Sequence, residues 1–373
     1  KRQGSAALAA VGSNGALINL LVNLFVGLAL GANVVAARCY GAKDDQGVHE
    51  AVQTAVTLSL VGGVLMAFVG FFAAHGLLEL MSSPEDVIDL ATLYLKIYFI
   101  GMPMTMLYNF NASLLRAVGD TRRPLVCLAV AGVINVVLNL LFVIVFQMSV
   151  AGVALATILS QTVSAIMVTV LLVKEEGAMH LDLRHLGFHK KAMLQIIQIG
   201  LPAGLQSTVF SLSNVVIQSA INSFGAAAIA GNTAAASIEG FATTVSNSIS
   251  QAALTFSSQN MGAGKYARVR RVLVVCLAAT LIGGLCMGLL IDTFGTPLLA
   301  LFNTDPDVIA CGLIRVSHNM PPYFLFCLQD TFVGLLRGIG YSLLPTVTSL
   351  SGICLLRIVW LYTAFAASPT LDT

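Results

Sequence analysis

The sequence predicts an all-α protein that crosses a membrane many times and consists of two similar halves. Hydrophobic residues make up 57% of the 373 residues, charged residues make up only 10%, and the mean hydropathy is +0.89. Soluble domains carry about a quarter charged residues, so this composition indicates a polytopic membrane protein. Strand-like alternation between turn clusters is missing from the sequence, which argues against a membrane barrel.

Uncharged runs mark the expected spans. The longest are 50 residues at 124–173 and 47 residues at 192–238, each enough for two spans of roughly 20 residues. Several expected helices exceed about 25 residues, which implies tilt or extension beyond the hydrocarbon. We expect ten helices, at approximately 4–36, 46–76, 86–115, 122–147, 149–173, 190–221, 225–258, 266–298, 306–337 and 343–366.

An internal repeat with a shift of 221 positions runs through the chain. Leu-Leu-Arg-Ala-Val-Gly at 114–119 returns as Leu-Leu-Arg-Gly-Ile-Gly at 335–340, and the same shift carries Gly4 onto Gly225 and Pro124 onto Pro345. One period holds six expected helices, an even number, so both copies enter the membrane from the same side. Such parallel repeats are typical of secondary transporters, in which two halves enclose a site near the middle of the bilayer.

The repeat also predicts the domain organisation. We expect an N-terminal lobe at 1–173, a polar cytoplasmic linker at 174–191 and a C-terminal lobe at 192–373. Helix 190–221 would pair with residues before Lys1, and helix 149–173 with residues after Thr373. The pattern therefore resembles a protein of twelve helices that lacks the first and the last.

The distribution of cations predicts the orientation. The loops between the cation-rich ones carry acids such as Glu79, Asp86 and Asp292 and hold no Lys or Arg. The positive-inside rule places the cation-rich loops in the cytoplasm. The net charge of +2 reflects this bias. Nucleic-acid binding would need a basic, polar patch, which the sequence does not show, so we expect no nucleic-acid partner. Of the 19 Lys and Arg, 14 lie in alternate loops and helix ends: Arg38, Lys43, Arg116, Arg122, Arg123, Lys174, Arg184, Lys190, Lys191, Lys265, Arg268, Arg270, Arg271 and Arg337.

Enzyme and metal signatures are missing. The seven cysteines are an odd number without a C-x-x-C pair and are expected to be small buried hydrophobes. The linker crowds His180, Asp182, His185 and His189, but without the ligand spacing of a structural zinc site. H-E-x-x-H, G-x-S-x-G and phosphate-loop motifs do not occur, and Arg116 to Asp120 has Ala117 where an intramembrane aspartyl protease needs Gly. We expect no enzyme, no catalytic residue, no metal and no cofactor beyond H⁺ or Na⁺ as coupling ion.

Two acids fall within expected spans, where a charge costs roughly 2.5–3.5 kcal/mol. Glu239 has no basic residue within two turns on its own helix, whereas Asp330 lies seven residues before Arg337 on the same face. Asp330 is therefore also a candidate for an intrahelical pair. A carboxyl in apolar surroundings can alternate between protonated and ionised forms, which cation coupling requires. We predict that Glu239 and Asp330 are the cation-coupling residues.

Amides in the same spans are the candidates for substrate binding. Spacings of eight and four put Gln206, Asn214 and Gln218 near one helical face. The alternative is hydrogen bonding between helices, worth about 0.6 kcal/mol each. Proline at 103, 202 and 321–322 predicts kinks in or beside spans. Such kinks could let a helix bend during transport, or they could only improve packing, and the sequence favours neither. The candidate substrate-binding residues are Gln206, Asn214, Gln218, Asn232, Asn247, Gln251, Asn135 and Asn139.

Four loop motifs together resemble the multidrug and toxic compound extrusion (MATE) family over essentially the whole chain. They are Ala37-Arg38-Cys39-Tyr40-Gly41-Ala42-Lys43-Asp44, the two Leu-Leu-Arg repeats, and Gln259-Asn260-Met261-Gly262-Ala263-Gly264-Lys265. The resemblance implies two six-helix lobes, no use of ATP, and export of amphipathic, often cationic compounds in exchange for H⁺ or Na⁺. It also implies a monomeric multi-pass protein of the bacterial plasma (inner) membrane.

The family's site residues carry over only in part. Family members often have Asn followed four positions later by Asp in their fifth helix, and here the matching pair is Asn135 and Asn139. A further acid of the family's first helix would lie before Lys1. The resemblance therefore shifts the expected coupling site to Glu239 and to Asp330, whose helix carries a coupling acid in some members, offset by about one turn.

Two other functions stay open. A flippase for lipid-linked oligosaccharides shares this architecture and would hold a diphosphate with cations, for which Lys96, Arg315 and Arg357 are the candidates. A channel or a membrane receptor is the other alternative. Vesicle assays separate them, because a flippase moves labelled lipid, a channel passes ions without exchange, and an exporter couples drug flux to a cation gradient.

Overall fold

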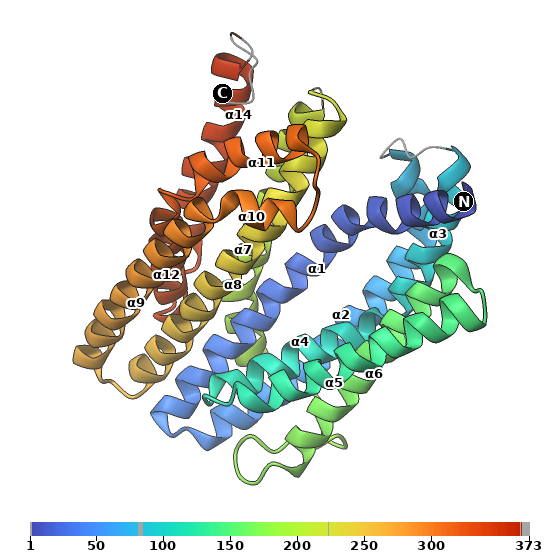
Figure 1. Cartoon of the computed structure of the whole chain (residues 1–373). Helices are drawn as coiled ribbons and strands as arrows, with labels where there is room; N and C mark the ends of the chain where they lie inside the picture. Colours follow the sequence, from blue (N-terminus) through green and yellow to red (C-terminus); the bar gives the residue numbers. More distant parts are fainter. Residues whose placement is uncertain (1, 81–84, 223, 366, 368–373) are drawn as a thin grey trace. The chain divides into compact units, whose positions relative to one another are not determined.

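The computed structural model describes residues 2–80, 85–222, 224–365 and 367, and in this part of the chain every regular element is a helix (Figure 1). The expected all-α class is confirmed. The elements are α1 (Arg2–Ala42), α2 (Asp45–Leu80), α3 (Glu85–Ile100), α4 (Met102–Ala117), α5 (Arg122–Leu140), η1 (Leu141–Val145), α6 (Ser149–Lys174), α7 (Lys190–Asn222), α8 (Ala226–Gly262), α9 (Tyr266–Thr293), α10 (Gly295–Ala300), α11 (Pro306–Asn319), α12 (Tyr323–Gly338), α13 (Leu343–Ser349), η2 (Leu350–Leu355), α14 (Leu356–Trp360) and η3 (Leu361–Phe365).

The ten expected helices are all found in the described residues, and several are interrupted. The helix expected at 86–115 is α3 and α4, which meet at Gly101 with a bend of 48°. The helix expected at 306–337 is α11 and α12, which are separated at Pro321–Pro322. Proline lacks an N–H and its ring clashes with the preceding turn, so a break beside proline is expected. Pro202, by contrast, lies inside an unbroken α7.

The sequence repeat is reproduced in the backbone. A shift of 221 carries α4 (Met102–Ala117) onto α12 (Tyr323–Gly338) without offset, and the first residue of α2 onto the first residue of α9. Gly119 and Gly340, which follow these helices, have φ of +93° and +102°. Each donates its N–H to the carbonyl three residues earlier, of Arg116 and Arg337, at 2.9 Å. Glycine is required there because a Cβ disfavours the left-handed region.

The chain packs as two units, residues 1–208 and 209–373. The boundary lies within α7, so the packing divides the chain at a different point from the linker at 174–191. The lobe limits 1–173 and 192–373 stay a prediction.

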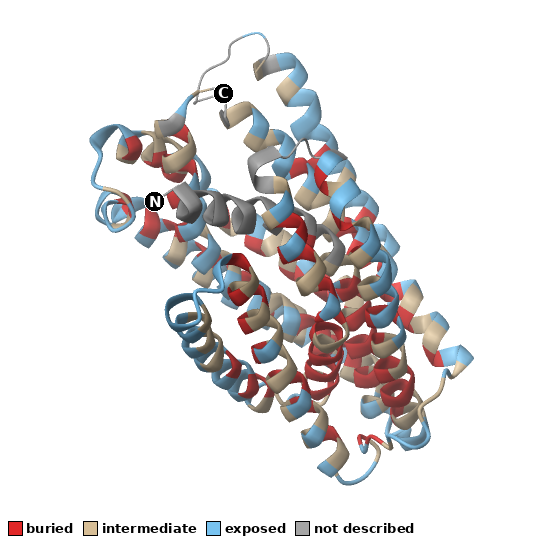
Figure 2. Cartoon of the chain, turned by 90° about the vertical axis from the view of Figure 1, so that its right-hand side faces the viewer, coloured by how far each residue is buried: buried red, intermediate tan, exposed pale blue. Residues whose placement is uncertain are grey.

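In unit 1, α1 and the first part of α7 cross at backbone contact through glycines. A Cβ added to Gly27 would lie 2.2 Å from the backbone nitrogen of Gly204, and one added to Gly200 would lie 2.6 Å from Cα of Leu28. Small residues allow this approach and are typical of helix contacts in membranes. Figure 2 shows buried residues on the helix faces that meet and exposed residues on the opposite faces.

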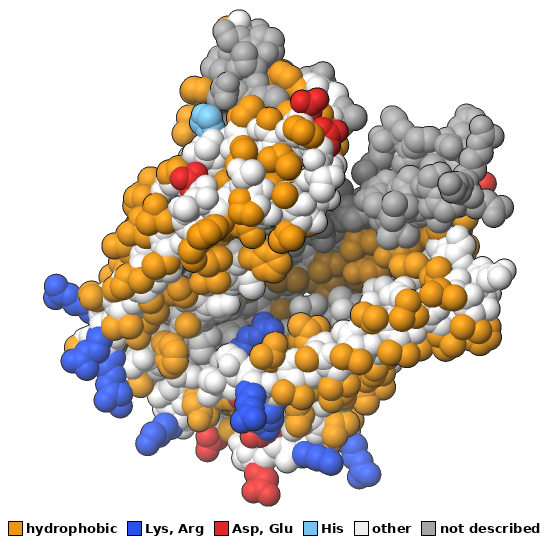
Figure 3. All heavy atoms as spheres, viewed as in Figure 1, with side chains coloured by type: hydrophobic (Ala, Val, Ile, Leu, Met, Phe, Trp, Pro, Cys, Tyr) orange, Lys and Arg blue, Asp and Glu red, His pale blue; other side chains and the backbone are white. Residues whose placement is uncertain are grey.

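Among the described residues, six helices are long and apolar enough to cross a membrane, and the bent pair α3–α4 makes a possible seventh. The 24-residue segment Arg122–Val145 is strongly apolar and very little of it is buried, so its apolar side chains face the surroundings. The polar ends follow the expected pattern within unit 2. The start of α9 carries Arg268, Arg270 and Arg271, and its last turn carries Asp292. Figure 3 shows Lys and Arg side chains at the end of unit 2 where α9 begins.

Candidate polar site in the second unit

Two packed helices of unit 2 supply the central charged residues. On α8, Asn232, Glu239 and Thr243 follow at spacings of seven and four, which places them along one face. α11 begins at Pro306 after Asp305, whose side chain accepts a hydrogen bond from the N–H of Asp307. Proline at the first position and a carboxylate cap favour a helix start at this point. α11 and α8 pack against each other, which brings the two sets of side chains together.

Arg315 of α11 binds Glu239 of α8 at two points. Its Nε donates to Oε1 of Glu239 at 2.9 Å and its Nη2 donates to Oε2 at 2.5 Å. Asn319, one turn further along α11, donates to the same Oε1 at 3.1 Å. The Glu239 side chain is only 13% exposed and that of Arg315 is 30% exposed. Both carboxylate oxygens of Glu239 are thus occupied in largely buried surroundings.

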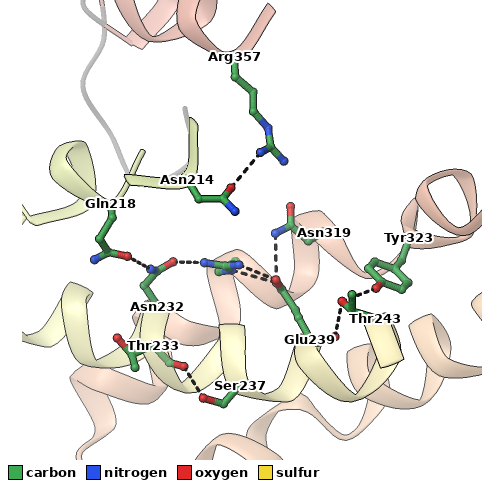
Figure 4. Close-up of polar contacts among 11 residues, drawn as sticks. Asn214, Gln218, Asn232, Thr233, Ser237, Glu239, Thr243, Asn319, Tyr323 and Arg357 are labelled. Atoms are coloured by element: carbon green, nitrogen blue, oxygen red, sulfur yellow. Dashed lines mark hydrogen bonds and ion pairs between the residues drawn. The ribbon is translucent and has the colours of Figure 1, made fainter. Parts of the chain in front are cut away.

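A chain of amides continues from this pair to α7 (Figure 4). Nη1 of Arg315 donates to Oδ1 of Asn232, and Nδ2 of Asn232 donates to Oε1 of Gln218 at 2.9 Å. On the same side of unit 2, Nη1 of Arg357 donates to Oδ1 of Asn214 at 3.2 Å. α7, α8, α11 and α14 therefore all contribute polar side chains to this region. We call this set the unit 2 polar network; its members are Asn214, Gln218, Asn232, Glu239, Arg315, Asn319 and Arg357.

The unit 2 polar network can act as an electrostatic switch. A two-point guanidinium–carboxylate pair is strong in low dielectric and depends on an ionised carboxylate. Adding a proton to Glu239, or a Na⁺ to its oxygens, removes the negative charge that holds Arg315. A cation could therefore change how α11 is held against α8.

Asp330 occupies a separate position on α12. Its Oδ2 accepts a hydrogen bond from Ser246 of α8 at 3.4 Å, and its backbone carbonyl accepts one from Ser250 at 2.8 Å. The pairing of Asp330 with Arg337 along the same helix stays a prediction. Asp330 is hydrogen-bonded to Ser246 and Ser250, whereas the Glu239 carboxylate is hydrogen-bonded to Arg315 and Asn319.

The other candidate amides lie in other parts of the structure. Asn135 bonds to Ser160 at 3.2 Å and Asn139 bonds to Asn135 at 3.0 Å, all within unit 1. Gln206 is buried in the part of α7 that belongs to unit 1. Asn247 and Gln251 are exposed on α8, about 12 and 18 Å along the axis beyond Glu239.

Sequence reasoning missed the ionic partner of Glu239. The helix of Glu239 has no cation within two turns, whereas Arg315 comes from α11, 76 positions later. The sequence suggests Arg315 only as a ligand for a diphosphate. One sequence signal does point to a polar contact of this helix. Arg315 and Asn319 are four residues apart, so they share one face of the helix expected at 306–337. Lys96, another flippase candidate, lies 5.4 Å from the ring centroid of Phe71.

Metal ligands are sparse in the described part of the chain, where no group of three or more His, Cys, Asp or Glu comes together. In the linker, Nδ1 of His185 lies 2.6 Å from Oδ2 of Asp182. This contact lowers the pKa of Asp182, helped by the backbone N–H of Arg184. The linker cluster therefore forms local bonds within a solvated turn.

Several apolar helices long enough to cross a membrane, together with a largely buried charged network between α8 and α11, are typical of polytopic membrane transporters. The family model MatE matches residues 1–141 and 202–363. The chain therefore belongs to the MatE family of multidrug efflux transporters, as its loop motifs predicted. This is a family of multi-pass membrane proteins that take small molecules, and it is not an enzyme family.

The chain is similar to several named proteins and to solved structures. It is 28% identical over 357 residues to the probable multidrug resistance protein YoeA of Bacillus subtilis, covering 94% of this chain and 77% of that protein. It is 25% identical over 315 residues to an FAD transporter of Shewanella oneidensis, covering 82% and 69%. A crystal structure of a mutant of the Vibrio cholerae MATE transporter VcmN matches with a TM-score of 0.91 at 20% identity, covering 100% and 84%.

Proposed function

We propose that the protein is a secondary antiporter that exports amphipathic small molecules, cationic drugs among them, in exchange for H⁺ or Na⁺. The observation that carries this proposal is the pair of Glu239 and Arg315, a carboxylate held at two points in the helical core of unit 2. A cation that binds the carboxylate competes directly with Arg315. The multidrug resistance protein among the relatives supports drugs as substrates. The relative named as an FAD transporter supports a wider range of small molecules.

In this proposal Glu239 carries the coupling ion and Asp330 is the second candidate. Asn214, Asn247 and Gln251 are exposed amides that an amphipathic molecule can reach, while Gln218 and Asn232 align the ion pair. Loading Glu239 with H⁺ or Na⁺ would release Arg315, and release of the cation would restore the pair. Alternation of these two states couples the cation gradient to the drug.

The test is ethidium transport by proteoliposomes under an imposed pH or Na⁺ gradient. Glu239→Gln keeps the side-chain shape and removes the negative charge, so gradient-driven transport should fall to background while ethidium binding largely survives. Asp330→Asn should be milder if that residue mainly interacts with Arg337. Glu176→Gln, in the exposed linker, is the matched control and should transport normally.

Transport at the wild-type rate by Glu239→Gln would exclude Glu239 and move the coupling site to Asp330. The same vesicles address the open alternatives. Movement of labelled lipid without ethidium exchange would favour the flippase, and ion flux without exchange would favour a channel.

A further inference from the structure

Arg357 is a cation in the candidate span Leu343–Thr363. In the described part of the chain it donates one hydrogen bond, to the amide oxygen of Asn214. A guanidinium has five N–H donors, and a charge at the centre of a span costs roughly 2.5–3.5 kcal/mol by insertion scales. One bond to a neutral amide leaves donors for another acceptor, and the side chain is exposed rather than packed away.

The helix around Arg357 is irregular. α14 is a single short α-helical turn between the π-helical segments η2 and η3. π-Helical turns are less favourable than α-helix and occur often at functional sites. This irregularity, independent of the charge, places Arg357 where the span departs from regular packing.

The charges of the unit 2 polar network do not cancel. It holds two guanidinium groups, Arg315 and Arg357, and one carboxylate, Glu239, whose two oxygens both bind Arg315. The charge of Arg315 also acts on Arg357. The network therefore carries a surplus positive charge on the side of Arg357, which an anion would neutralise.

We infer that Arg357 and Asn214 bind an anionic group, a carboxylate or a phosphate, on the transported molecule. The planar guanidinium offers two parallel donors to such a group. Asn214 holds the guanidinium with its oxygen, and its amide nitrogen can donate to the same anion. The inference rests on the proposed function, because it places this contact on the substrate pathway, and it extends the substrate class to molecules with an acidic group. A phosphate could come from a dissolved molecule or from a lipid headgroup.

The experiment measures equilibrium binding of riboflavin and flavin mononucleotide, which share a ring system and differ by one phosphate. Binding is followed by flavin fluorescence with the protein in phosphatidylcholine nanodiscs, and empty nanodiscs give the background. The wild type should bind flavin mononucleotide at least about tenfold more tightly than riboflavin, the difference expected for one charge-assisted contact. Arg357→Gln should abolish this preference and change riboflavin affinity by less than about twofold. Arg357→Lys should keep part of the preference, since it keeps the charge but not the fork.

Lys96→Gln, which removes a span cation of unit 1, is the control and should keep the full preference. A second arm uses nanodiscs that contain phosphatidylglycerol. Loss of the preference only in that lipid would assign the anion site to lipid headgroups, and its persistence would assign it to dissolved molecules. Equal affinities of the two flavins for wild type, or an unchanged preference in Arg357→Gln, would overturn the inference. No gradient is applied, so failure of the proposed antiport would not affect this readout.

Discussion

Arg315 and Glu239 form a two-point ion pair between α11 and α8, with N–O distances of 2.9 and 2.5 Å, although 76 positions separate them in the chain. The repeat does not duplicate this pair. A shift of 221 carries Glu239 onto Ile18 and Arg315 onto Tyr94, and both counterparts are buried. The two copies therefore share a backbone plan, and only the second copy has this charge pair.

Arg315→Gln should destabilise unit 2 by leaving Glu239 without its guanidinium. Removing one partner of a buried pair costs about 3–5 kcal/mol, and we expect about 2 kcal/mol here because nearly a third of the Arg315 side chain is exposed. Thermal unfolding in detergent would show this as a lower Tm. Combining it with Glu239→Gln should recover part of the loss. Strictly additive losses would mean that the two side chains are not coupled.

Gly27→Val should disrupt unit 1. Its Cβ would lie 2.2 Å from the backbone of Gly204, so α1 and α7 would have to separate. We expect a loss of at least about 2 kcal/mol, typical of overpacking, and poor yield of folded protein by size-exclusion chromatography. Gly132→Val on α5 is the control, because a Cβ there meets nothing within 4 Å. Equal behaviour of the two variants would argue against the close crossing.

Asp120 should contribute stability that acid removes. Burial would raise its pKa, but hydrogen bonds from the side chain and backbone of Arg123 outweigh burial and lower it. A group with a lowered folded-state pKa stabilises above its unfolded pKa of about 3.9, and this contribution is lost as pH falls through the folded value. Between pH 6 and about pH 3, Tm should fall more for wild type than for Asp120→Asn. Asp292→Asn should follow wild type, and a wild-type pH profile in Asp120→Asn would contradict the assignment.

The two ends of unit 2 should label from opposite sides of the membrane. Lys265 lies in the cation-rich turn before α9, and Asp305 precedes α11 at the acidic end. The positive-inside rule puts the first in the cytoplasm. In right-side-out vesicles, Asp305→Cys should react with an impermeant maleimide and Lys265→Cys should not, each measured against the unmodified protein. Reaction of both from outside would overturn the orientation.

Much of the fold could be predicted because its signals are local. Hydropathy and charge predict where the helices end. The shift of 221 positions that relates the two Leu-Leu-Arg motifs also relates α4 to α12. The breaks at Gly101 and Pro321–Pro322 were less predictable, since proline also occurs at position 202 within a continuous α7. Whether a proline ends a helix depends on how neighbouring helices satisfy the freed carbonyls.

The candidate site could be predicted only in part. In the sequence Glu239 stands out as an acid in an expected span, and Asn214, Gln218 and Asn232 stand out as amides near it along the chain. Their partners could not be read from spacing on one helix, because Arg315 and Arg357 come from later helices. Asn135 and Asn139 also stand out in the sequence as amides in a span, but their hydrogen bonds are to Ser160 and to each other, within unit 1.

The sequence by itself determined the membrane environment, the helical class and the repeat that relates α4 to α12, and it predicted Glu239 as an acid in a span. These follow from composition and from spacing along the chain, which need no knowledge of which helices touch. Only the tertiary structure decided that Glu239 binds Arg315 and Asn319, and that Arg357 meets Asn214. The physical reason is that a buried charge is satisfied by whatever side chain helix packing brings within about 3 Å, and packing depends on the rotation and crossing of whole helices.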